Sequence, residues 1–305
     1  MSNLTSGFLL LEFSHVRELQ VLHFFLFLAL YLIIILENLL IIFVIALDHR
    51  LHIPMYFFLM NLAISDIGSV SVTLPKSMFN LLMNSTRISY FECVSQIFFF
   101  LVFECFDFAI LTIMSHDRYV AICNPLQYEL IMNKEACIQM TTIAWITSIL
   151  YSALHTAGTF SMNFCSNIVD QFFCEVPKLM KLSCSDLYLV EVGFMVFSYI
   201  AVLGCFIFII KTYVWIFTTV LKIPSKQGQH KAVSTCLPHL LVVSLFLFSS
   251  TFVYAIPHSN MSPDLDLVFA VIYAILPSLL NPFIYSLRNK EIQTALQKLL
   301  NLKHL

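Results

Sequence analysis

The chain has 305 residues, of which 59% are hydrophobic and 11% are charged, and its formal net charge is −2 at pH 7. A soluble domain usually carries about 25% charged residues, so this composition excludes an ordinary soluble domain. The chain also lacks the excess of Lys and Arg that a nucleic-acid-binding surface needs. We therefore expect a chain that is solvated mostly by lipid.

Seven segments are long and apolar enough to cross a membrane, for which a helix needs about 20 residues. The first contains one charged residue, Glu37, and the second contains Asp66. The third contains Glu104 and Asp107, and the fourth contains no Asp, Glu, Lys or Arg. Five predicted spans cover roughly residues 21–47, 53–80, 93–118, 189–221 and 267–286, and the fourth and sixth spans lie within residues 136–169 and 232–257. This pattern predicts an all-α membrane protein, a seven-transmembrane helix bundle.

The segment after the last span has basic residues alternating with leucines. Lys290, Lys298 and Lys303 are separated by Leu296 and a Leu-Leu pair. This spacing predicts a short amphipathic eighth helix that lies on the membrane surface. A frayed tail is the alternative.

Lys and Arg residues are distributed unevenly between the two sides of the predicted bundle. With the N-terminus outside, eleven of the 16 lie in cytoplasmic segments and five lie in outer segments, which is the bias expected of membrane proteins. We therefore predict an extracellular N-terminal tail at residues 1–20, a seven-transmembrane domain at residues 21–286 and a cytoplasmic tail at residues 287–305.

Three sequons for N-glycosylation fall on the predicted outer side, in agreement with this orientation. Asn3 and Asn84 are the expected acceptors. Asn260 is a poor acceptor, because Pro263 follows its sequon in a short loop.

Four of the nine cysteines lie on the predicted outer side of the membrane. Because that compartment is oxidising, we expect two disulfides there. Four cysteines allow three pairings, and their spacing does not choose between them. The four are Cys93, Cys165, Cys174 and Cys184. The other five lie in helices or near the cytosol, where we expect them to pack as small apolar side chains.

Four motifs follow one another along the chain. LHIPMYFFL stands at residues 51–59, MSHDRYVAIC at 114–123, KAVSTCLPHL at 231–240 and NPFIYSLRN at 281–289. They resemble the LHxPMYFFL, MAYDRYVAIC, KAFSTCxSHL and NPxIYSLRN signatures of the vertebrate odorant (olfactory) receptors, which are rhodopsin-like G-protein-coupled receptors. The MSHDRY and STCLPHL variants are similar to those of the family-14 subgroup. The motifs keep the family's order and span nearly the whole chain.

The resemblance implies a receptor in the plasma membrane and not an enzyme. It implies that small volatile molecules bind in a transmembrane pocket and activate a heterotrimeric G protein with a stimulatory or olfactory α subunit, which raises cAMP. It also implies the disulfides Cys93–Cys174 and Cys165–Cys184. The residues that it assigns to G-protein coupling and activation are Asp117, Arg118, Tyr119, Tyr213, Lys231, His239 and Tyr285.

The resemblance places the ligand pocket among the third, fifth, sixth and seventh helices, beneath the second outer loop. Most of the implied lining residues are apolar and a few are polar, as in other small-ligand sites. They are Phe100, Leu101, Glu104, Cys105, His155, Phe197, Ser198, Ala201, Leu247, Ser250, Tyr254, Val271 and Ala274. Glu104 could bind an amine or another polar odorant, or it could form an internal hydrogen bond, and both interpretations stay open. For Glu37 we expect a packing role.

A charged group in the bilayer costs at least about 2.5–3.5 kcal/mol, so each intramembrane acid needs a reason. The resemblance places Asp66 and Asp107 together in the bundle core, with Asn38 and Asn281 beside them. Two facing carboxylates cannot both stay ionised without a cation or a shared proton. We expect a sodium ion at this site, and the alternative is a hydrogen-bonded network without an ion. No other cofactor is expected.

Three other functions fit the sequence less well. A rhodopsin-like receptor for a peptide or an amine would differ at the second outer loop, where the extra cysteines match the odorant-receptor pattern. A transporter predicts half-helices or inverted repeats, and none are visible in the sequence. An intramembrane enzyme predicts a catalytic motif such as HExxH or a Ser/His/Asp set, and the sequence contains none in a shared accessible site.

Overall fold

The computed structural model describes residues 7–184, 188–222, 224–255, 263–288 and 290–301. Within this part of the chain, seven helices are long and apolar enough to cross a membrane. They are α1 (Arg17–Leu47), α2 (Pro54–Met83), α3 (Tyr90–Cys123), α5 (Lys134–Phe160), α7 (Tyr188–Leu221), α8 (Lys226–Ala255) and α9 (Pro263–Arg288). Each predicted span overlaps one of these helices, so the prediction of a seven-helix bundle is confirmed.

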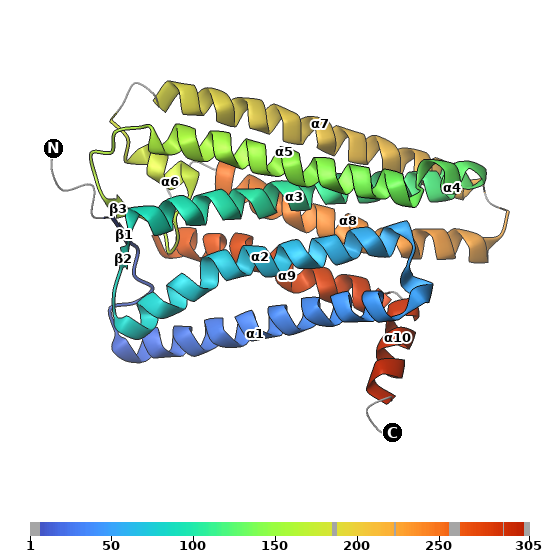
Figure 1. The fold of residues 1–305 in the computed structure, drawn as a ribbon, viewed down its shortest axis with the longest axis horizontal. Coiled ribbons are helices and arrows are strands. Elements are labelled where there is room, and N and C mark those ends of the chain that lie inside the picture. Colours follow the sequence, from blue (N-terminus) through green and yellow to red (C-terminus); the bar gives the residue numbers. More distant parts are fainter. Residues whose placement is uncertain (1–6, 185–187, 223, 256–262, 289, 302–305) are drawn as a thin grey trace.

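The seven helices lie side by side in one bundle (Figure 1). α1 packs against α2, α2 packs against α3, and α8 packs against α9. α3 is the central helix, since it also contacts α5, α7 and α8. The outward faces keep large apolar side chains exposed, among them Leu36, Phe43 and Leu150. Lipid covers such faces in a membrane, which explains why these helices are apolar on nearly all sides.

Short helical elements lie at the end of the bundle where α1 stops and α2 begins (Figure 1). They are η2 (His49–Leu51), η3 (Pro125–Gln127), α4 (Tyr128–Ile131) and α10 (Lys290–Asn301). α10 is amphipathic, because it buries Ile292 and Ala295 and exposes Glu291 and Lys298. The predicted eighth helix is therefore present.

A three-stranded sheet lies at the opposite end of the bundle, and its middle strand comes from the N-terminal segment. β1 (Phe8–Leu10) pairs antiparallel with β2 (Arg87–Ile88) and parallel with β3 (Ile168–Val169). The short helix α6 (Val176–Lys181) lies in the loop that follows β3. This sheet was not predicted from the sequence, and α1 begins at Arg17 rather than at the predicted residue 21. Much of the N-terminal segment is thus ordered against the outer loops.

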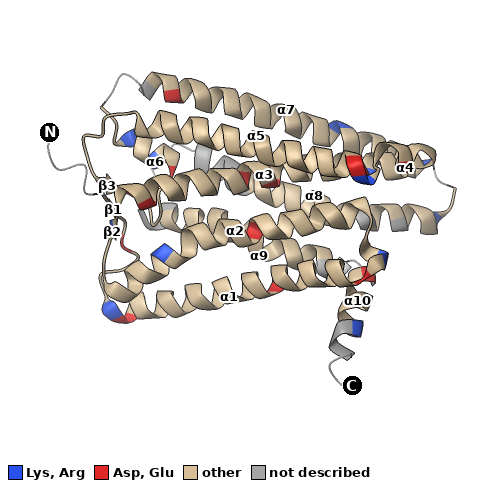
Figure 2. Cartoon of the chain, viewed as in Figure 1, with Lys and Arg blue, Asp and Glu red and all other residues tan. Residues whose placement is uncertain are grey.

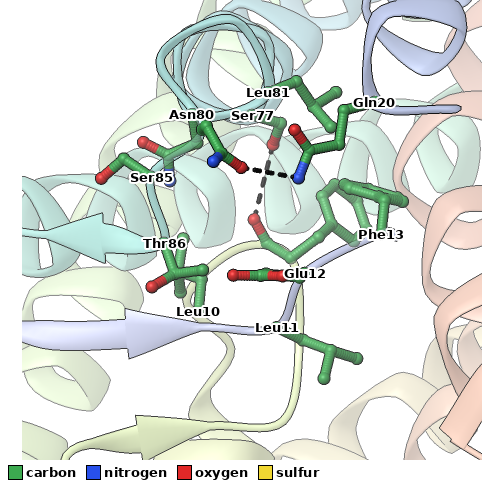
Figure 3. A pocket seen from close by; sticks show the side chains of 12 residues that line it. Leu10, Leu11, Glu12, Phe13, Gln20, Ser77, Asn80, Leu81, Ser85 and Thr86 are labelled. Atoms are coloured by element: carbon green, nitrogen blue, oxygen red, sulfur yellow. Dashed lines mark hydrogen bonds between the residues drawn. The ribbon is translucent and has the colours of Figure 1, made fainter. Parts of the chain in front are cut away.

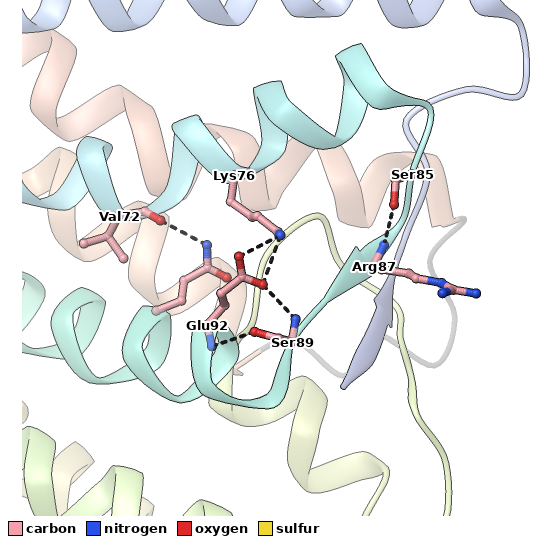
Figure 4. A network of polar contacts seen from close by, with 7 residues as sticks. Val72, Lys76, Ser85, Arg87, Ser89 and Glu92 are labelled. Carbon is pink, nitrogen blue, oxygen red and sulfur yellow. Dashed lines mark hydrogen bonds and ion pairs between the residues drawn. The ribbon is translucent and has the colours of Figure 1, made fainter. Parts of the chain in front are cut away.

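The start of α3 is fixed by a capping box and an ion pair with α2 (Figure 4). The hydroxyl of Ser89 accepts a hydrogen bond from the Glu92 backbone N–H at 3.2 Å, and the Glu92 carboxylate accepts one from the Ser89 N–H at 2.8 Å. Lys76 Nζ lies 3.0 Å from both carboxylate oxygens of Glu92. The capping box satisfies two backbone N–H groups of the helix end, next to the disulfide-bonded Cys93.

Both disulfides identify the sheet end of the bundle as the outer end. They are Cys93–Cys174 and Cys165–Cys184, which is the pairing that the resemblance implies. Disulfides persist in an oxidising compartment, so the end that carries α10 faces the cytoplasm. Figure 2 shows the charged residues of the described chain concentrated near the two ends, with a few acids inside the bundle.

Candidate functional site

The loop between α5 and α7 covers the outer end of the bundle. Cys174 is joined to Cys93 at the start of α3, and its backbone N–H donates a hydrogen bond to Gln96 Oε1 at 2.9 Å. The preceding residue, Phe173, is fully buried, and its ring centroid lies 5.2 Å from that of Phe100 on α3. The loop therefore places an aromatic side chain directly above the predicted ligand region.

Several predicted ligand-binding residues lie together beneath this loop. The Phe100 ring lies 5.8 Å from the Tyr273 ring of α9, and Val271 and Ala274 pack in the same apolar cluster. Glu104, one helical turn further along α3, has its carboxyl group within hydrogen-bonding reach of the Tyr273 side chain. Among the described residues, the Oε2 atom of Glu104 is buried without a hydrogen-bond partner. Glu104 thus has an internal partner and also a free acceptor.

Other predicted ligand-binding residues are not enclosed with this group. Phe197 and Ala201 lie one helical turn apart on an exposed face of α7. Leu101, Cys105 and Leu247 are half-buried. The side chains of two more lie outside the described part of the chain: Ser250 and Tyr254.

His155 and Ser198 belong to a polar cluster between α5 and α7. His155 Nδ1 lies 2.8 Å from Glu191 Oε1, and its Nε2 lies 3.0 Å from the Ser198 hydroxyl. The Ser198 hydroxyl donates to the Phe194 carbonyl at 2.7 Å, so it accepts the proton on His155 Nε2. Glu191 was not among the site residues predicted from the sequence. The signal was present, because a carboxylate within a predicted span requires a partner.

A small cavity lies at the outer end between the N-terminal segment, α1 and α2 (Figure 3). Gln20 Nε2 donates to Asn84 Oδ1 at 2.8 Å on its wall, and the Ser77 hydroxyl donates to the Phe172 carbonyl at 3.4 Å. The cavity volume is about 20 Å³, which is room for roughly one water molecule. Ligand sites usually have at least about 300 Å³, so this cavity is not the odorant site.

The predicted acid pair lies in the middle of the bundle. Asp66 is 1% exposed, and its two carboxylate oxygens accept hydrogen bonds from Asn281 Nδ2 at 3.2 and 3.1 Å. Asp107 is buried close enough to interact electrostatically with Asp66. Asn38 donates to the Ser278 carbonyl at 3.3 Å, which joins α1 to the same region of α9. The four residues expected to form the polar core are therefore close together.

Several oxygen atoms of this core have no donor. Asp107 Oδ1, Asn38 Oδ1 and Asn281 Oδ1 are buried without a hydrogen-bond partner among the described residues. Unpaired carboxylate and amide oxygens suit a hard cation or a shared proton. Within the described part of the chain, no cluster of three or more His, Cys, Asp or Glu side chains could hold a metal ion. The unpaired oxygens of this core are the atoms that a bound cation or a shared proton would contact.

At the cytoplasmic end of α3, Asp117 is held by a tyrosine of the following loop. The Tyr128 hydroxyl donates to Asp117 Oδ1 at 2.8 Å. Burial, and then the neighbouring carboxylate, raises the pKa of Tyr128 above its usual value, so the tyrosine stays protonated as a donor. Arg118 contacts the sulfur atom of Met55 on α2 and forms no ion pair among the described side chains. Tyr119 is half-buried.

A second set of hydrogen bonds joins α7 and α8 to α3. The Tyr213 hydroxyl lies 2.8 Å from His239 Nδ1, and His239 Nε2 lies 2.9 Å from the Leu111 carbonyl. Because a carbonyl only accepts, Nε2 carries the proton and Nδ1 accepts from Tyr213. The buried Tyr285 hydroxyl has no hydrogen-bond partner among the described residues. The side chain of Lys231 lies outside them.

A hydrogen bond between α2 and α10 was not predicted from the sequence either. The hydroxyl of Tyr56, which is 1% exposed, donates to Glu291 Oε2 at 2.6 Å. Tyr56 lies within the LHIPMYFFL motif, and Glu291 is the second residue of α10. The contact ties the surface helix to the membrane bundle.

Comparisons with known proteins agree with the resemblance of the motifs. The sequence profile of the family described as olfactory receptor matches residues 27–303. Olfactory receptor 14C36 of Homo sapiens is 48% identical over 294 residues, which cover 96% of this chain and 94% of that receptor. Olfactory receptor 14A16 of Homo sapiens is 47% identical over 303 residues, which cover 98% of each chain. Both relatives carry family-14 names, as the MSHDRY and STCLPHL variants indicate.

The fold is shared with a solved structure. The crystal structure of squid rhodopsin matches this chain with a TM-score of 0.73 at 17% sequence identity, and the match covers 94% of this chain and 87% of that chain. The relatives are receptors and not enzymes, so the enzyme alternative is excluded. With the seven spans, the motifs and the full-length relatives in agreement, the chain belongs to the olfactory receptor family of rhodopsin-like G-protein-coupled receptors.

Proposed function

We propose that this receptor binds a small volatile molecule in its outer half and activates a G protein of the stimulatory or olfactory type, which raises cAMP. The observation that carries the proposal is the arrangement around Arg118. Asp117 is hydrogen-bonded to Tyr128, and Arg118 forms no ion pair among the described side chains. A guanidinium group is always charged, so Arg118 is available to the backbone carbonyl groups of an inserted α-subunit helix.

The ligand class follows from the side chains beneath the outer loop. Phe100, Val271, Ala274 and the Tyr273 ring form a mostly apolar surface, and Glu104 adds one free acceptor. Burial of apolar area contributes roughly 25 cal/mol per Å². A volatile molecule of modest size therefore binds with an affinity on the order of micromolar. A hydroxyl or an amine on that molecule would hydrogen-bond to Glu104.

Activation shifts an equilibrium between a closed and an open cytoplasmic end. His239 holds α8 against the Leu111 carbonyl of α3, and Tyr213 holds α7 against His239. Opening breaks these two hydrogen bonds, each of which contributes about 0.5–1.5 kcal/mol. Tyr213 loses its partner in this step, and the Tyr285 hydroxyl gains one. The ligand acts only by binding the open state more tightly than the closed state.

We further propose that a sodium ion stabilises the closed state at Asp66 and Asp107. The support is the pair of buried carboxylates, with Asp107 Oδ1 unpaired among the described residues and Asn281 orienting Asp66. The ion would offset one of the two negative charges, which otherwise repel each other in the bundle core. A sodium-dependent shift of odorant potency that Asp107→Asn removes would support this site.

The same proposal covers location and modification. The receptor acts in the plasma membrane, with residues 1–20 outside and residues 287–305 in the cytoplasm. N-glycans are attached at Asn3 and Asn84. Asn84 supports this assignment because its side chain is exposed at the outer end of α2.

A cAMP reporter in cells that express an olfactory-type α subunit tests the function. Odorants from a panel are compared between the unmodified receptor and Arg118→Ala at matched surface expression. We expect Arg118→Ala to abolish the response, and Lys222→Ala, at an exposed cytoplasmic residue, to preserve it. A full response from Arg118→Ala would contradict the mechanism. A fall in cAMP would contradict the α-subunit class.

A further inference from the structure

A groove lies on the membrane-facing side of the cytoplasmic end, between α1, η2, α2 and α5. Its volume is about 530 Å³, which is in the range of about 300–1,000 Å³ that ligand sites occupy. Most of its wall is apolar, and it contains no residue assigned to odorant or G-protein binding. The main apolar residues of the wall are Ile45, Ile53, Phe57, Met60, Met132 and Ile138. Ile53 and Ile138 are 43% and 45% exposed, so this surface is open to lipid.

Two basic side chains lie at the rim of the groove. Lys134, the first residue of α5, is exposed and has no hydrogen-bond or ion-pair partner among the described residues. His52 Nε2 lies 3.1 Å from the Ile45 carbonyl, so Nε2 carries a proton and Nδ1 of the neutral ring can accept a hydrogen bond, as from the ammonium group of a phosphatidylserine headgroup. Arg50 lies two residues before His52. Glu135 follows Lys134 in sequence but does not line the groove.

The polar and apolar residues of the groove are ordered by depth in the membrane. α2 runs into the bundle from Pro54, and α5 runs into it from Lys134. Lys134 therefore lies at the cytoplasmic surface, as does His52. Phe57 and Ile138 lie about one helical turn deeper along their helices. A molecule that matches this order has an anionic head at the surface and an apolar chain directed toward the membrane centre.

We propose that this groove binds one anionic phospholipid of the cytoplasmic leaflet, with its headgroup at Lys134 and His52 and an acyl chain against Phe57, Met60 and Ile138. That leaflet contains anionic lipids, which attract basic side chains near its surface. A sterol would also fill the apolar wall, but its hydroxyl group carries no charge to pair with Lys134. The lipid joins α1 and α2 to α5 on the face opposite to the bundle interior.

Photocrosslinking of the full-length receptor in phosphatidylcholine nanodiscs tests this site. The discs contain a minor fraction of a photoactivatable phosphatidylserine, and the labelled peptides are identified by mass spectrometry. We expect labels on residues 52–60 and 134–138. Lys134→Gln lowers the labelling about fivefold, since one Lys near an anionic surface is worth about that factor. Lys222→Gln, a matched change on another cytoplasmic loop, leaves it unchanged.

A second variant tests the apolar part of the site. Ile138→Trp fills the groove without changing its charge, so it should lower labelling by the phosphatidylserine probe while Lys134 is still present. Where Lys134→Gln does not fold, Lys134→Arg should keep the labelling and His52→Gln should reduce it. Equal labelling by a phosphatidylcholine probe would overturn the proposal. Displacement by cholesterol, or an equal loss in Lys222→Gln, would overturn it as well.

Discussion

His155 of α5 and Glu191 of α7 are in contact at 2.8 Å across the outer half of the bundle, and both side chains are almost fully buried. Ser198 accepts the Nε2 proton of His155, because its own proton is donated to the Phe194 carbonyl. One further proton therefore lies between Nδ1 and the Glu191 carboxyl group. The pair is neutral as a whole, whether it is an imidazolium with a carboxylate or a histidine with a carboxylic acid.

The first prediction concerns the loss of this partner. His155→Ala leaves the buried Glu191 with only the Thr159 hydroxyl at 3.4 Å among its described hydrogen bonds. Removal of one member of a buried charged pair costs about 3–5 kcal/mol. We expect a markedly lower unfolding temperature for the purified receptor. The double variant His155→Ala with Glu191→Gln should recover most of the lost stability, because Gln carries no charge that needs a partner. If His155→Ala were as stable as the unmodified receptor, this result would contradict the pairing of His155 with Glu191.

The second prediction concerns the glycine that makes room for this carboxylate. A Cβ atom at Gly158 would collide with Glu191 Oε2, whereas a Cβ atom at Gly193 would meet nothing within 4 Å. The Glu191 carboxyl group is held by His155 at 2.8 Å and can move aside only by losing that contact. Gly158→Ala should therefore destabilise the receptor by about 1–3 kcal/mol, as overpacking does, less the gain of up to about 1 kcal/mol that Ala has over Gly in a helix. Gly193→Ala, the matched control, should stabilise it by up to about 1 kcal/mol through helix propensity. Thermal unfolding measures both. Equal behaviour of the two variants would show that Glu191 does not occupy this position.

The third prediction concerns basal signalling and depends on the proposed G-protein coupling. Tyr128→Phe removes the donor to Asp117, and hydrogen bonds to charged groups contribute about 1.5–3 kcal/mol. We expect the closed state to lose this stabilisation, so that the equilibrium shifts toward the open state by at least about tenfold and basal cAMP rises without odorant. Tyr199→Phe, at an exposed tyrosine of α7, is the control. Unchanged basal cAMP in Tyr128→Phe at equal surface expression would exclude this role.

The fourth prediction concerns the tie between α2 and α10. Tyr56→Phe removes the 2.6 Å hydrogen bond to Glu291, at a cost of about 1 kcal/mol. The amides of residues 290–301 should then exchange with deuterium about fivefold faster. The control is Tyr31→Phe, which removes a 3.2 Å contact between the Tyr31 hydroxyl of α1 and the Ser71 hydroxyl of α2. It should leave the exchange of these amides unaffected. No change in Tyr56→Phe would mean that other contacts alone hold the surface helix.

The spans could be predicted because apolarity over some 20 residues is a local property of the chain. The same local reasoning placed the start of α1 at residue 21 rather than Arg17, because Glu18 interrupts the apolar run. β1 could not be predicted in this way, because a strand of three residues forms only by pairing with partners far along the chain. Nor could spacing pair the outer cysteines, for which only the family resemblance supplied an answer.

The candidate sites also contain some residues that the sequence could locate and some contacts that it could not. Motifs located Asp117 and Asn281, and the structure shows their partners. The pairing of His155 with Glu191 depends on how α5 and α7 are rotated against each other, which the sequence of either helix does not contain. Rotation also explains why Phe197 and Ser198, neighbours in sequence, differ: one is exposed and the other bonds to His155.

The central position of β1 has a consequence for the biosynthesis of the receptor. Residues 8–10 are synthesised first, but their partners at 87–88 and 168–169 are made only after two and four of the long helices. The outer sheet can therefore close only after α5 has been inserted with its end on the same side as the N-terminus. A chain with one helix inserted in the wrong direction leaves β1 without β3. Pairing of these few residues thus reports on the topology of more than half of the protein.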